Sequence, residues 1–197
     1  INNIIVHFGK LESGVAKVND SATCLIDSEK RQHTAANHSA THLLHQALRE
    51  TLGDTVQQRG SSVTDKHLTF DFTHDRALTS NEVSQIENDI TKEIEADIRT
   101  TVTNMKYNDA INKGALALFD EKYSEDVRVL KIGSKSLELC GGTHVGSTSE
   151  IKVFKILSES SVSTGIRRIE AITGHAAYVY FQELFDQNKE VSQLLNT

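Results

Sequence analysis

Two pairs of potential metal ligands, separated by much of the chain, restrict the fold more than any other feature. His38 and His42 are four residues apart, and Cys140 and His144 repeat this spacing, with Cys140 98 positions after His42. On a helix, a spacing of four places two side chains on one face, one turn apart. Thiolate and imidazole ligands together suit zinc. A fold that uses both pairs must bring a helix near residue 40 against a tight turn near residue 142.

The pattern leaves the type of metal site open. His45 lies on the same helical stripe as His38 and His42 and is an alternative ligand. Ser39 stands where the zinc peptidase motif HExxH has glutamate, so that class is excluded. Four protein ligands close a tetrahedral zinc, whereas a catalytic zinc keeps one open position. The site is therefore structural, or one ligand stands back, or the metal expands its coordination.

Hydrophobic periodicity predicts helices separated by short strands. Helices are expected at about 34–52, ending at Gly53, at about 80–99 with Ser80 as N-cap, at 109–115 and at about 175–195. A hairpin is expected with arms at 61–63 and 67–72, and further strands at 101–105, 127–132, 137–140, 151–157 and 166–172. Strands mixed with segregated helices predict an α+β fold, an antiparallel sheet with helices packed on it.

The order of these elements suggests three parts. Residues 1–30 alternate in polarity and contain Gly9, Gly14 and a turn-like Asn19-Asp20, which predicts part of a small β subdomain. Residues 31–174 form the main domain, and 175–197 read as a connecting helix. The missing initiator methionine favours a fragment of a longer protein.

Composition limits the possible partners and the compartment. The net charge of −6 argues against an autonomous nucleic-acid binder, although an active site that handles one RNA end remains compatible with it. No apolar run reaches the ~20 residues of a membrane span. Cys24 lies in an apolar, strand-like stretch and is expected to be buried. Two cysteines do not make a disulfide framework, so a cytoplasmic location is expected.

Six segments together carry a family resemblance. They are NHSATHLLHQAL (37–48), QRGSSV (58–63), FDF (70–72), GALALFDEKYSEDVRVL (114–130), ELCGGTHV (138–145) and GIRRIEAITG (165–174). In this order they closely resemble the editing domain of alanyl-tRNA synthetase, over roughly residues 1–174. The threonyl-tRNA synthetase editing domain and the free-standing AlaX proteins are similar. Thr143 stands where the threonyl version typically has proline, which favours the alanyl branch.

The resemblance implies a deacylase that hydrolyses the ester of Ser-tRNA(Ala) and Gly-tRNA(Ala). It implies one zinc ion per chain, surrounded by the four motif residues, and the acceptor end of tRNA(Ala) as the RNA partner. It places Thr41 and Gln58 near the aminoacyl group, and Glu138 matches an acidic position of the threonyl relatives. The flanking aminoacylation and C-terminal domains of a full synthetase are absent from this chain.

Such an activity has a physical reason. A pocket for alanine excludes serine by only about 10²-fold, so a second site must supply further discrimination. If Thr41 and Gln58 hydrogen-bond the serine hydroxyl, alanine leaves these groups unpaired. The amides of Gly141 and Gly142 are candidate donors to the oxyanion of the tetrahedral intermediate.

Arg167 and Arg168 are neighbours in an expected strand, so they point to opposite faces of the sheet. At most one of them faces the terminal phosphate or ribose, and we assign this substrate-binding role to Arg167. Two alternatives to an editing domain within a synthetase remain. One is a free-standing AlaX-type deacylase, and the other is a structural zinc module that binds RNA without catalysis.

Overall fold

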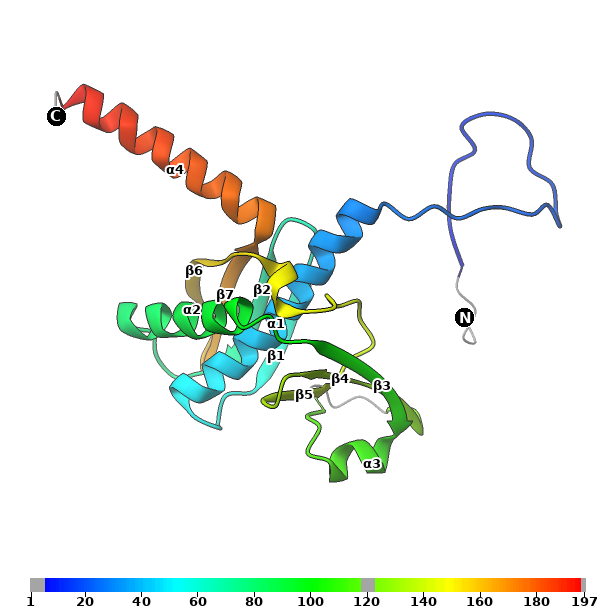
Figure 1. Ribbon diagram of the computed structural model, residues 1–197, viewed down its shortest axis with the longest axis horizontal. Coiled ribbons are helices and arrows are strands. Elements are labelled where there is room, and N and C mark those ends of the chain that lie inside the picture. The colour runs from blue at the N-terminus through cyan, green and yellow to red at the C-terminus, as the bar shows by residue number, and fades with distance from the viewer. Residues whose placement is uncertain (1–5, 118–122, 196–197) are drawn as a thin grey trace.

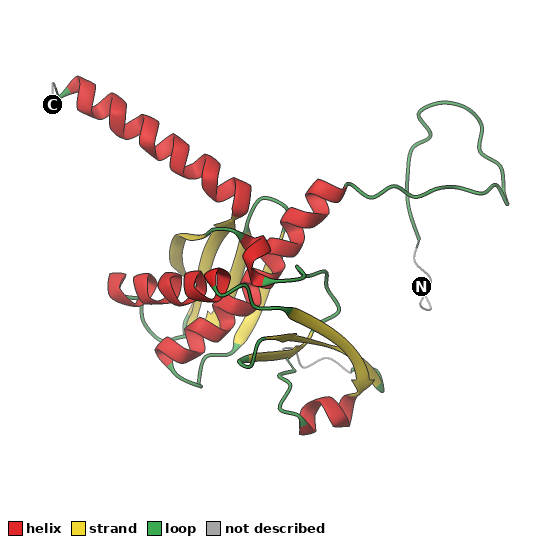
Figure 2. Ribbon diagram, in the orientation of Figure 1, coloured by secondary structure: helices red, strands yellow, loops and turns green. Residues whose placement is uncertain are grey.

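The fold combines helices with two antiparallel sheets, as Figures 1 and 2 show. The structure, a computed structural model, describes residues 6–117 and 123–195. The helices are α1 (Ser28–Leu52), α2 (Ser80–Glu95), α3 (Tyr107–Asn112) and α4 (Gly174–Leu194), with a 3-10 helix η1 (Thr148–Ile151). The strands are β1 (Gln58–Val63), β2 (Leu68–Thr73), β3 (Thr100–Lys106), β4 (Asp126–Ile132), β5 (Ser136–Leu139), β6 (Phe154–Ser163) and β7 (Ile166–Thr173). The predicted α+β class is confirmed.

The larger sheet has the strand order β1-β2-β7-β6 and supports α1. Along β2, side chains alternate between the two faces, and Leu68, Phe70 and Phe72 are fully buried. They belong to the same core cluster as Leu44 and Leu48 of α1. The predicted hairpin is confirmed, and its arms extend to β1 and β2. This packing makes α1 a rigid support for the histidines that it carries.

Helix α1 begins six residues before the predicted start. The Asp27 carboxylate accepts a hydrogen bond from the amide of Lys30 and caps the helix there. The first turns are polar and exposed, so hydrophobic periodicity does not mark them. The predicted end is confirmed, because Gly53 at φ +103° stops the helix.

Helix α2 packs its apolar stripe against α1, and its ends differ from those expected. Ile86, Ile90 and Ile94 are buried, as the periodicity predicts. The N-cap is Thr79 rather than Ser80, since Thr79 and Glu82 form a reciprocal capping box. The helix ends at Glu95, and the chain then turns into β3.

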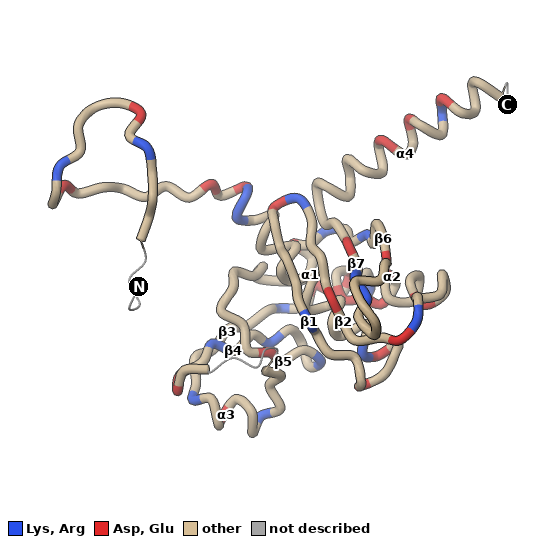
Figure 3. Tube along the Cα trace, turned by 180° about the vertical axis from the view of Figure 1, so that it is seen from behind, with Lys and Arg blue, Asp and Glu red and all other residues tan. Residues whose placement is uncertain are grey.

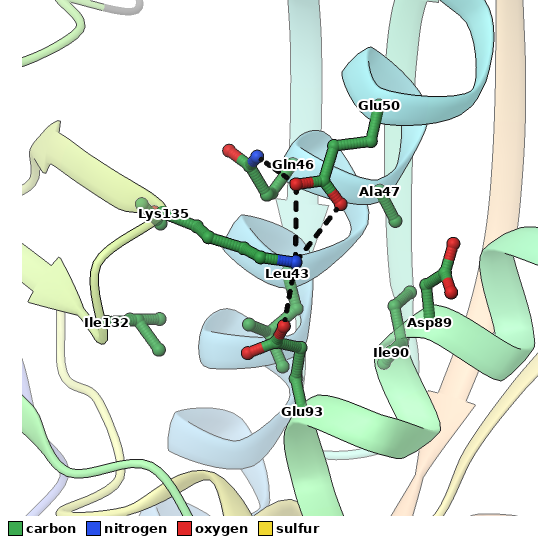
Figure 4. A pocket seen from close by; sticks show the side chains of 10 residues that line it. Leu43, Gln46, Ala47, Glu50, Asp89, Ile90, Glu93, Ile132 and Lys135 are labelled. Carbon is green, nitrogen blue, oxygen red and sulfur yellow. Dashed lines mark hydrogen bonds and ion pairs between the residues drawn. The ribbon is translucent and has the colours of Figure 1, made fainter. Parts of the chain in front are cut away.

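The smaller sheet has the order β3-β4-β5. Lys135, in the turn between β4 and β5, joins this sheet to α1 and α2 (Figure 4). Its Nζ lies 3.3 Å from Glu50 Oε1 of α1 and 3.1 Å from Glu93 Oε1 of α2. The β4–β5 hairpin is therefore held beside α1, and the loop that follows β5 carries Cys140.

Other boundaries also differ from the predictions. The short helix is at 107–112 rather than 109–115. The expected strand 151–157 is replaced by η1, with its Ser147–Glu150 capping box, followed by β6, which continues to Ser163. The part of the GALALFDEKYSEDVRVL motif at 118–122 lies outside the described residues, as do residues 196–197 of the expected connecting helix.

The two ends of the described chain extend away from the body in Figure 1. Residues 6–27 form no helix or strand, so the strands expected there are not observed. Cys24 is exposed, which contradicts the expected buried thiol, and Cys24 and Cys140 are not disulfide-bonded. Of the helices described, none is long and apolar enough to cross a membrane. The proposed division at residues 30 and 174 stays a prediction.

Candidate metal centre

The four residues of the two sequence pairs converge on one point between α1 and the turn after β5. One ligand atom from each of His38, His42, Cys140 and His144 lies within 4.8 Å of the others. Cys140 Sγ is 3.5 Å from His38 Nε2 and 3.3 Å from His144 Nε2. This juxtaposition of two distant segments is the arrangement that the spacing predicts.

The donor set fits a tetrahedral zinc ion. Ligand atoms at ~2.0–2.3 Å from a tetrahedral zinc lie about 3.3–3.8 Å from one another. The two Cys140–histidine distances fall in this range. Among the described residues, buried His42 Nε2 has no hydrogen-bond partner. A buried ring nitrogen without a partner is costly, and a metal ion at the centre of the cluster would satisfy it.

Glu138 orients His42 from behind. Its Oε2 lies 2.6 Å from His42 Nδ1, and its Oε1 lies 3.3 Å from the Ser136 hydroxyl and 3.4 Å from His45 Nδ1. His42 is 3% exposed and Glu138 is 2% exposed. A carboxylate that holds one ring nitrogen directs the other toward the metal and raises the basicity of the ring. Glu138 therefore contacts a candidate ligand, and the catalytic role expected for it stays a prediction.

The same contacts explain the protonation of the cluster. Burial disfavours the imidazolium of His42, but the Glu138 carboxylate outweighs this and raises the pKa of His42 to about 10. Burial likewise raises the pKa of the Cys140 thiol, but hydrogen bonds with His144 and His38 outweigh it and lower that pKa to about 3. Cys140 is therefore a thiolate at neutral pH, which is the form that binds a metal ion.

Ser39 holds His144 on the other side of the cluster. Its Oγ lies 3.3 Å from His144 Nδ1 and accepts a hydrogen bond from the amide of Val145. Ser39 is fully buried. The residue that replaces the peptidase glutamate thus orients a ligand, a role that the sequence did not reveal.

The two glycines after Cys140 differ in their surroundings. A Cβ added at Gly142 would lie 2.0 Å from His38 Cε1, whereas one added at Gly141 would meet nothing within 4 Å. The backbone of Gly142 therefore packs directly on the imidazole of His38. Among the described residues, none accepts a hydrogen bond from the amide of either glycine. Both amides remain available as donors.

Thr41 and Gln58, the expected pocket residues, have partners of their own. Thr41 is 4% exposed and donates its hydroxyl hydrogen bond to the Asn37 carbonyl of the same helix. Gln58 is half-buried on β1, and its Nε2 donates to the Ser61 hydroxyl. Each keeps acceptor capacity, and their roles toward a substrate stay predictions.

Arg167 is already paired. Its Nη2 lies 2.7 Å from Glu159 Oε2, and its Nε contacts Oε1 of the same carboxylate. Arg168 makes the equivalent pair with Asp71. The substrate-binding role assigned to Arg167 therefore stays a prediction, and it requires exchange of this ion pair.

His45 does not join the cluster, although it lies on the same helix. Its Nδ1 points to Glu138, and its ring packs 5.5 Å from that of Phe70. The alternative in which His45 replaces a ligand is not supported. His45 instead contacts Glu138, whereas the sequence suggested only a ligand role for it.

Comparison with known proteins places this site in a family. The family model of the threonyl and alanyl tRNA synthetase second additional domain matches residues 127–170, which include nearly all of β4, all of β5 and the turn that carries Cys140 and His144. This part of the chain is therefore similar to the second additional domain of these aminoacyl-tRNA synthetases.

Curated relatives identify the branch. The alanine–tRNA ligase of Thermoanaerobacter sp. (strain X514) is 48% identical over 195 residues, which is 99% of this chain and 22% of the relative. That of Fervidobacterium nodosum is 50% identical over 193 residues, 96% of this chain and 22% of the relative. The chain belongs to the alanyl-tRNA synthetase family as an editing-type domain. It spans about a fifth of the length of the curated relatives that it matches.

Proposed function

We propose that this chain hydrolyses the ester bond of Ser-tRNA(Ala) and Gly-tRNA(Ala), with one zinc ion bound at His38, His42, Cys140 and His144. The observation that carries the proposal is the convergence of these donors around the unpartnered Nε2 of buried His42. Family membership supplies the class of substrate.

The reaction adds the oxygen of water to the carbonyl carbon of the ester and breaks the bond to the ribose oxygen. The ribose oxygen gains a proton, and the products are a free amino acid and tRNA. When bound, the metal supplies Lewis acidity to the carbonyl or to the attacking water. The amides of Gly141 and Gly142, from which no described residue accepts a hydrogen bond, would donate to the developing oxyanion.

Discrimination against alanine falls to Thr41 and Gln58 in this proposal. Thr41 is on α1 between His38 and His42, and its hydroxyl oxygen can accept a further hydrogen bond. The amide oxygen of Gln58 is a second acceptor. A serine hydroxyl would satisfy such groups, whereas alanine would leave them unpaired. Glycine editing rests on the family resemblance alone.

The acceptor end of tRNA(Ala) is the proposed RNA partner. Lysines and arginines are interspersed with acidic residues along the chain (Figure 3), and the net charge is −6. Such a surface holds a polyanion weakly. We therefore expect deacylation to accelerate when the flanking aminoacylation and C-terminal domains are joined to this chain. Equal rates with and without them would count against this view.

Deacylation assays on Ser-, Gly- and Ala-tRNA(Ala), paired with metal analysis, test the proposal. Wild type should release serine and glycine much faster than alanine, and Cys140→Ala should release none while remaining folded. His33→Ala, which alters a histidine of α1 outside the cluster, is the matched control and should behave as wild type.

A structural zinc module is the second candidate, because four protein donors would close a tetrahedral metal ion. It predicts unfolding on chelation and no hydrolysis by a zinc-replete domain. A free-standing AlaX-type deacylase shares the proposed chemistry. A native start and stop codon directly bounding this sequence would identify it.

A further inference from the structure

We propose that Arg128 is a positioning residue that holds the Cys140–His144 turn in its metal-binding geometry. This inference rests on the metal site of the proposed function. Its guanidinium Nη1 donates to the backbone carbonyl of Cys140 at 2.9 Å and to that of Gly142. The amide of Cys140 in turn donates to the Arg128 carbonyl at 3.0 Å. One residue of β4 thus fixes the turn through three hydrogen bonds.

These three hydrogen bonds, here called the Arg128 clamp, affect three of the four candidate ligands. Cys140 is one of the clamped residues, and His144 follows two residues after Gly142. Gly142 also packs on His38, since a Cβ there would lie 2.0 Å from the ring. When Arg128 holds the Gly142 carbonyl, it keeps the backbone against the ring of His38 and so limits the space in which this ring can turn.

The surroundings of Arg128 distinguish it from the two arginines of β7. Arg167 and Arg168 each pair with a carboxylate. Arg128 is half-buried, and within the described part of the chain no carboxylate lies within ion-pair distance of it. Its partners are the carbonyls of the turn, so its desolvation is compensated only if the turn keeps this shape. The guanidinium and the turn therefore stabilise each other.

Strand β4 gives the clamp a firm base. It is the central strand of the smaller sheet, and its residues Val129 and Leu130, which follow Arg128, are buried. The turn itself has little regular structure of its own. Besides Arg128, Ser39 anchors the turn through its contacts with His144 and Val145, and the Thr100 hydroxyl donates to the Val145 carbonyl. Neither residue contacts the carbonyl of Cys140 or of Gly142.

The test compares Arg128→Met, Arg128→Lys and Lys131→Ala. Methionine keeps an apolar stem and removes every donor, whereas lysine keeps the charge but has a compact ammonium in place of the planar fork. Lys131 is exposed on the same strand and makes none of these hydrogen bonds, so its variant is the matched control. Thermal unfolding verifies that each variant is folded.

Cobalt(II) alone is the metal probe, with affinity measured against a competing chelator and geometry read from the visible absorption bands. Residues that orient metal ligands typically contribute 10–100-fold in metal affinity. We expect Arg128→Met to lower the cobalt affinity by about this factor and to alter the thiolate-to-cobalt band, with Arg128→Lys intermediate and Lys131→Ala within twofold of wild type. A wild-type affinity and spectrum for Arg128→Met would overturn the proposal. If that variant does not fold, the same result for Arg128→Lys would overturn it.

A metal-free measurement separates this proposal from the proposed function. In a Cys24→Ser background, the rate at which Cys140 reacts with a thiol reagent reports the order of the turn. Arg128→Met should react at least several-fold faster than the Lys131→Ala control. Equal rates would contradict the clamp, even if wild type bound no cobalt. A wild type that binds cobalt without deacylation would instead refute the proposed function alone.

Discussion

Two polar clusters join α1 to the β4–β5 region, and they differ in how far their groups satisfy one another. Around Lys135, the carboxylates of Glu50 and Glu93 compensate the ammonium group (Figure 4). Asp89, which lines the same cavity, pairs with Lys92. The cavity there has a volume of about 20 Å³, room for about one water molecule.

In the metal cluster, by contrast, several soft donors converge and His42 Nε2 is left without a partner among the described residues. The charges beside Lys135 compensate one another through ion pairs. In the cluster beside Cys140, by contrast, a bound metal ion would give His42 Nε2 the partner that it lacks. Four converging donors with one buried ring nitrogen left unpartnered, rather than a cavity, mark the candidate metal site among the described residues.

Removal of Cys140 should produce the largest effect. Structural zinc sites contribute ~10–16 kcal/mol of binding, so loss of one ligand of four costs about 3 kcal/mol or more, roughly 100-fold in affinity. We expect Cys140→Ala to bind zinc roughly 100-fold more weakly and to lose deacylation. Competition with a chelator measures the zinc affinity. An unchanged affinity would show that Cys140 is not a ligand.

Gly142→Ala should come next. The new methyl group must displace His38 or the turn, and such overpacking costs about 1–3 kcal/mol. We expect a roughly 5- to 150-fold loss of cobalt affinity at this cost. Gly141→Ala is the matched control, because its methyl group meets nothing within 4 Å. Equal affinities for the two variants would mean that the packing on His38 has no influence on the metal.

Glu138→Gln tests the orienting carboxylate. It preserves size but removes the charge that holds His42, and we expect a 10- to 100-fold loss of zinc affinity. Glu50→Gln removes the corresponding charge from the Lys135 cluster and should leave the zinc affinity unchanged. Competition with a chelator measures both. Equal losses of zinc affinity in the two variants would show that Glu138 has no special role in orienting His42.

The pH dependence of metal binding follows from the pKa shifts. In the metal-free protein His42 is protonated below a pKa of about 10, and Cys140 is already a thiolate above about 3. The metal must displace the proton of His42, so affinity should rise about tenfold per pH unit between pH 7 and 8. If metal binding also had to displace a proton from Cys140, the affinity would rise about a hundredfold per pH unit. In Glu138→Gln the slope should fall, because His42 loses the partner that raises its pKa.

Lys135→Ala should have the smallest effect. Its ion pairs are partly exposed, with the lysine side chain 49% accessible, and such pairs contribute about 0–1 kcal/mol. We expect a change of this size in the free energy of unfolding by urea and none in zinc affinity. A change in zinc affinity as large as that of Glu138→Gln would remove the distinction between the clusters.

The sequence predicted the elements that depend on local periodicity. The helix that carries His38 and His42, the hairpin of β1 and β2 and the isoleucine stripe of α2 follow from patterns within each segment. Ends set by side-chain caps were missed, such as the Asp27 cap of α1 and the Thr79 cap of α2. Residues 6–27 alternate in polarity without forming strands, because period alone does not supply a partner strand.

The convergence of the four candidate ligands could be predicted because two spacings pointed to one chemistry. Their supports could not, because they depend on tertiary placement. Ser39 and Arg128 act through contacts with residues about 105 and 12 positions away, which no local pattern encodes. Glu138 was chosen from the family resemblance, and only the structure shows that it contacts His42 from behind.

Deacylation of Ser-tRNA(Ala) by zinc-replete wild type and by folded Cys140→Ala tests the central claim most directly. We predict release of serine by wild type, little release from Ala-tRNA(Ala), and no release by the variant. Intact Ser-tRNA(Ala) after incubation with wild type that carries one zinc per chain and is joined to its flanking domains would contradict the proposed deacylase activity.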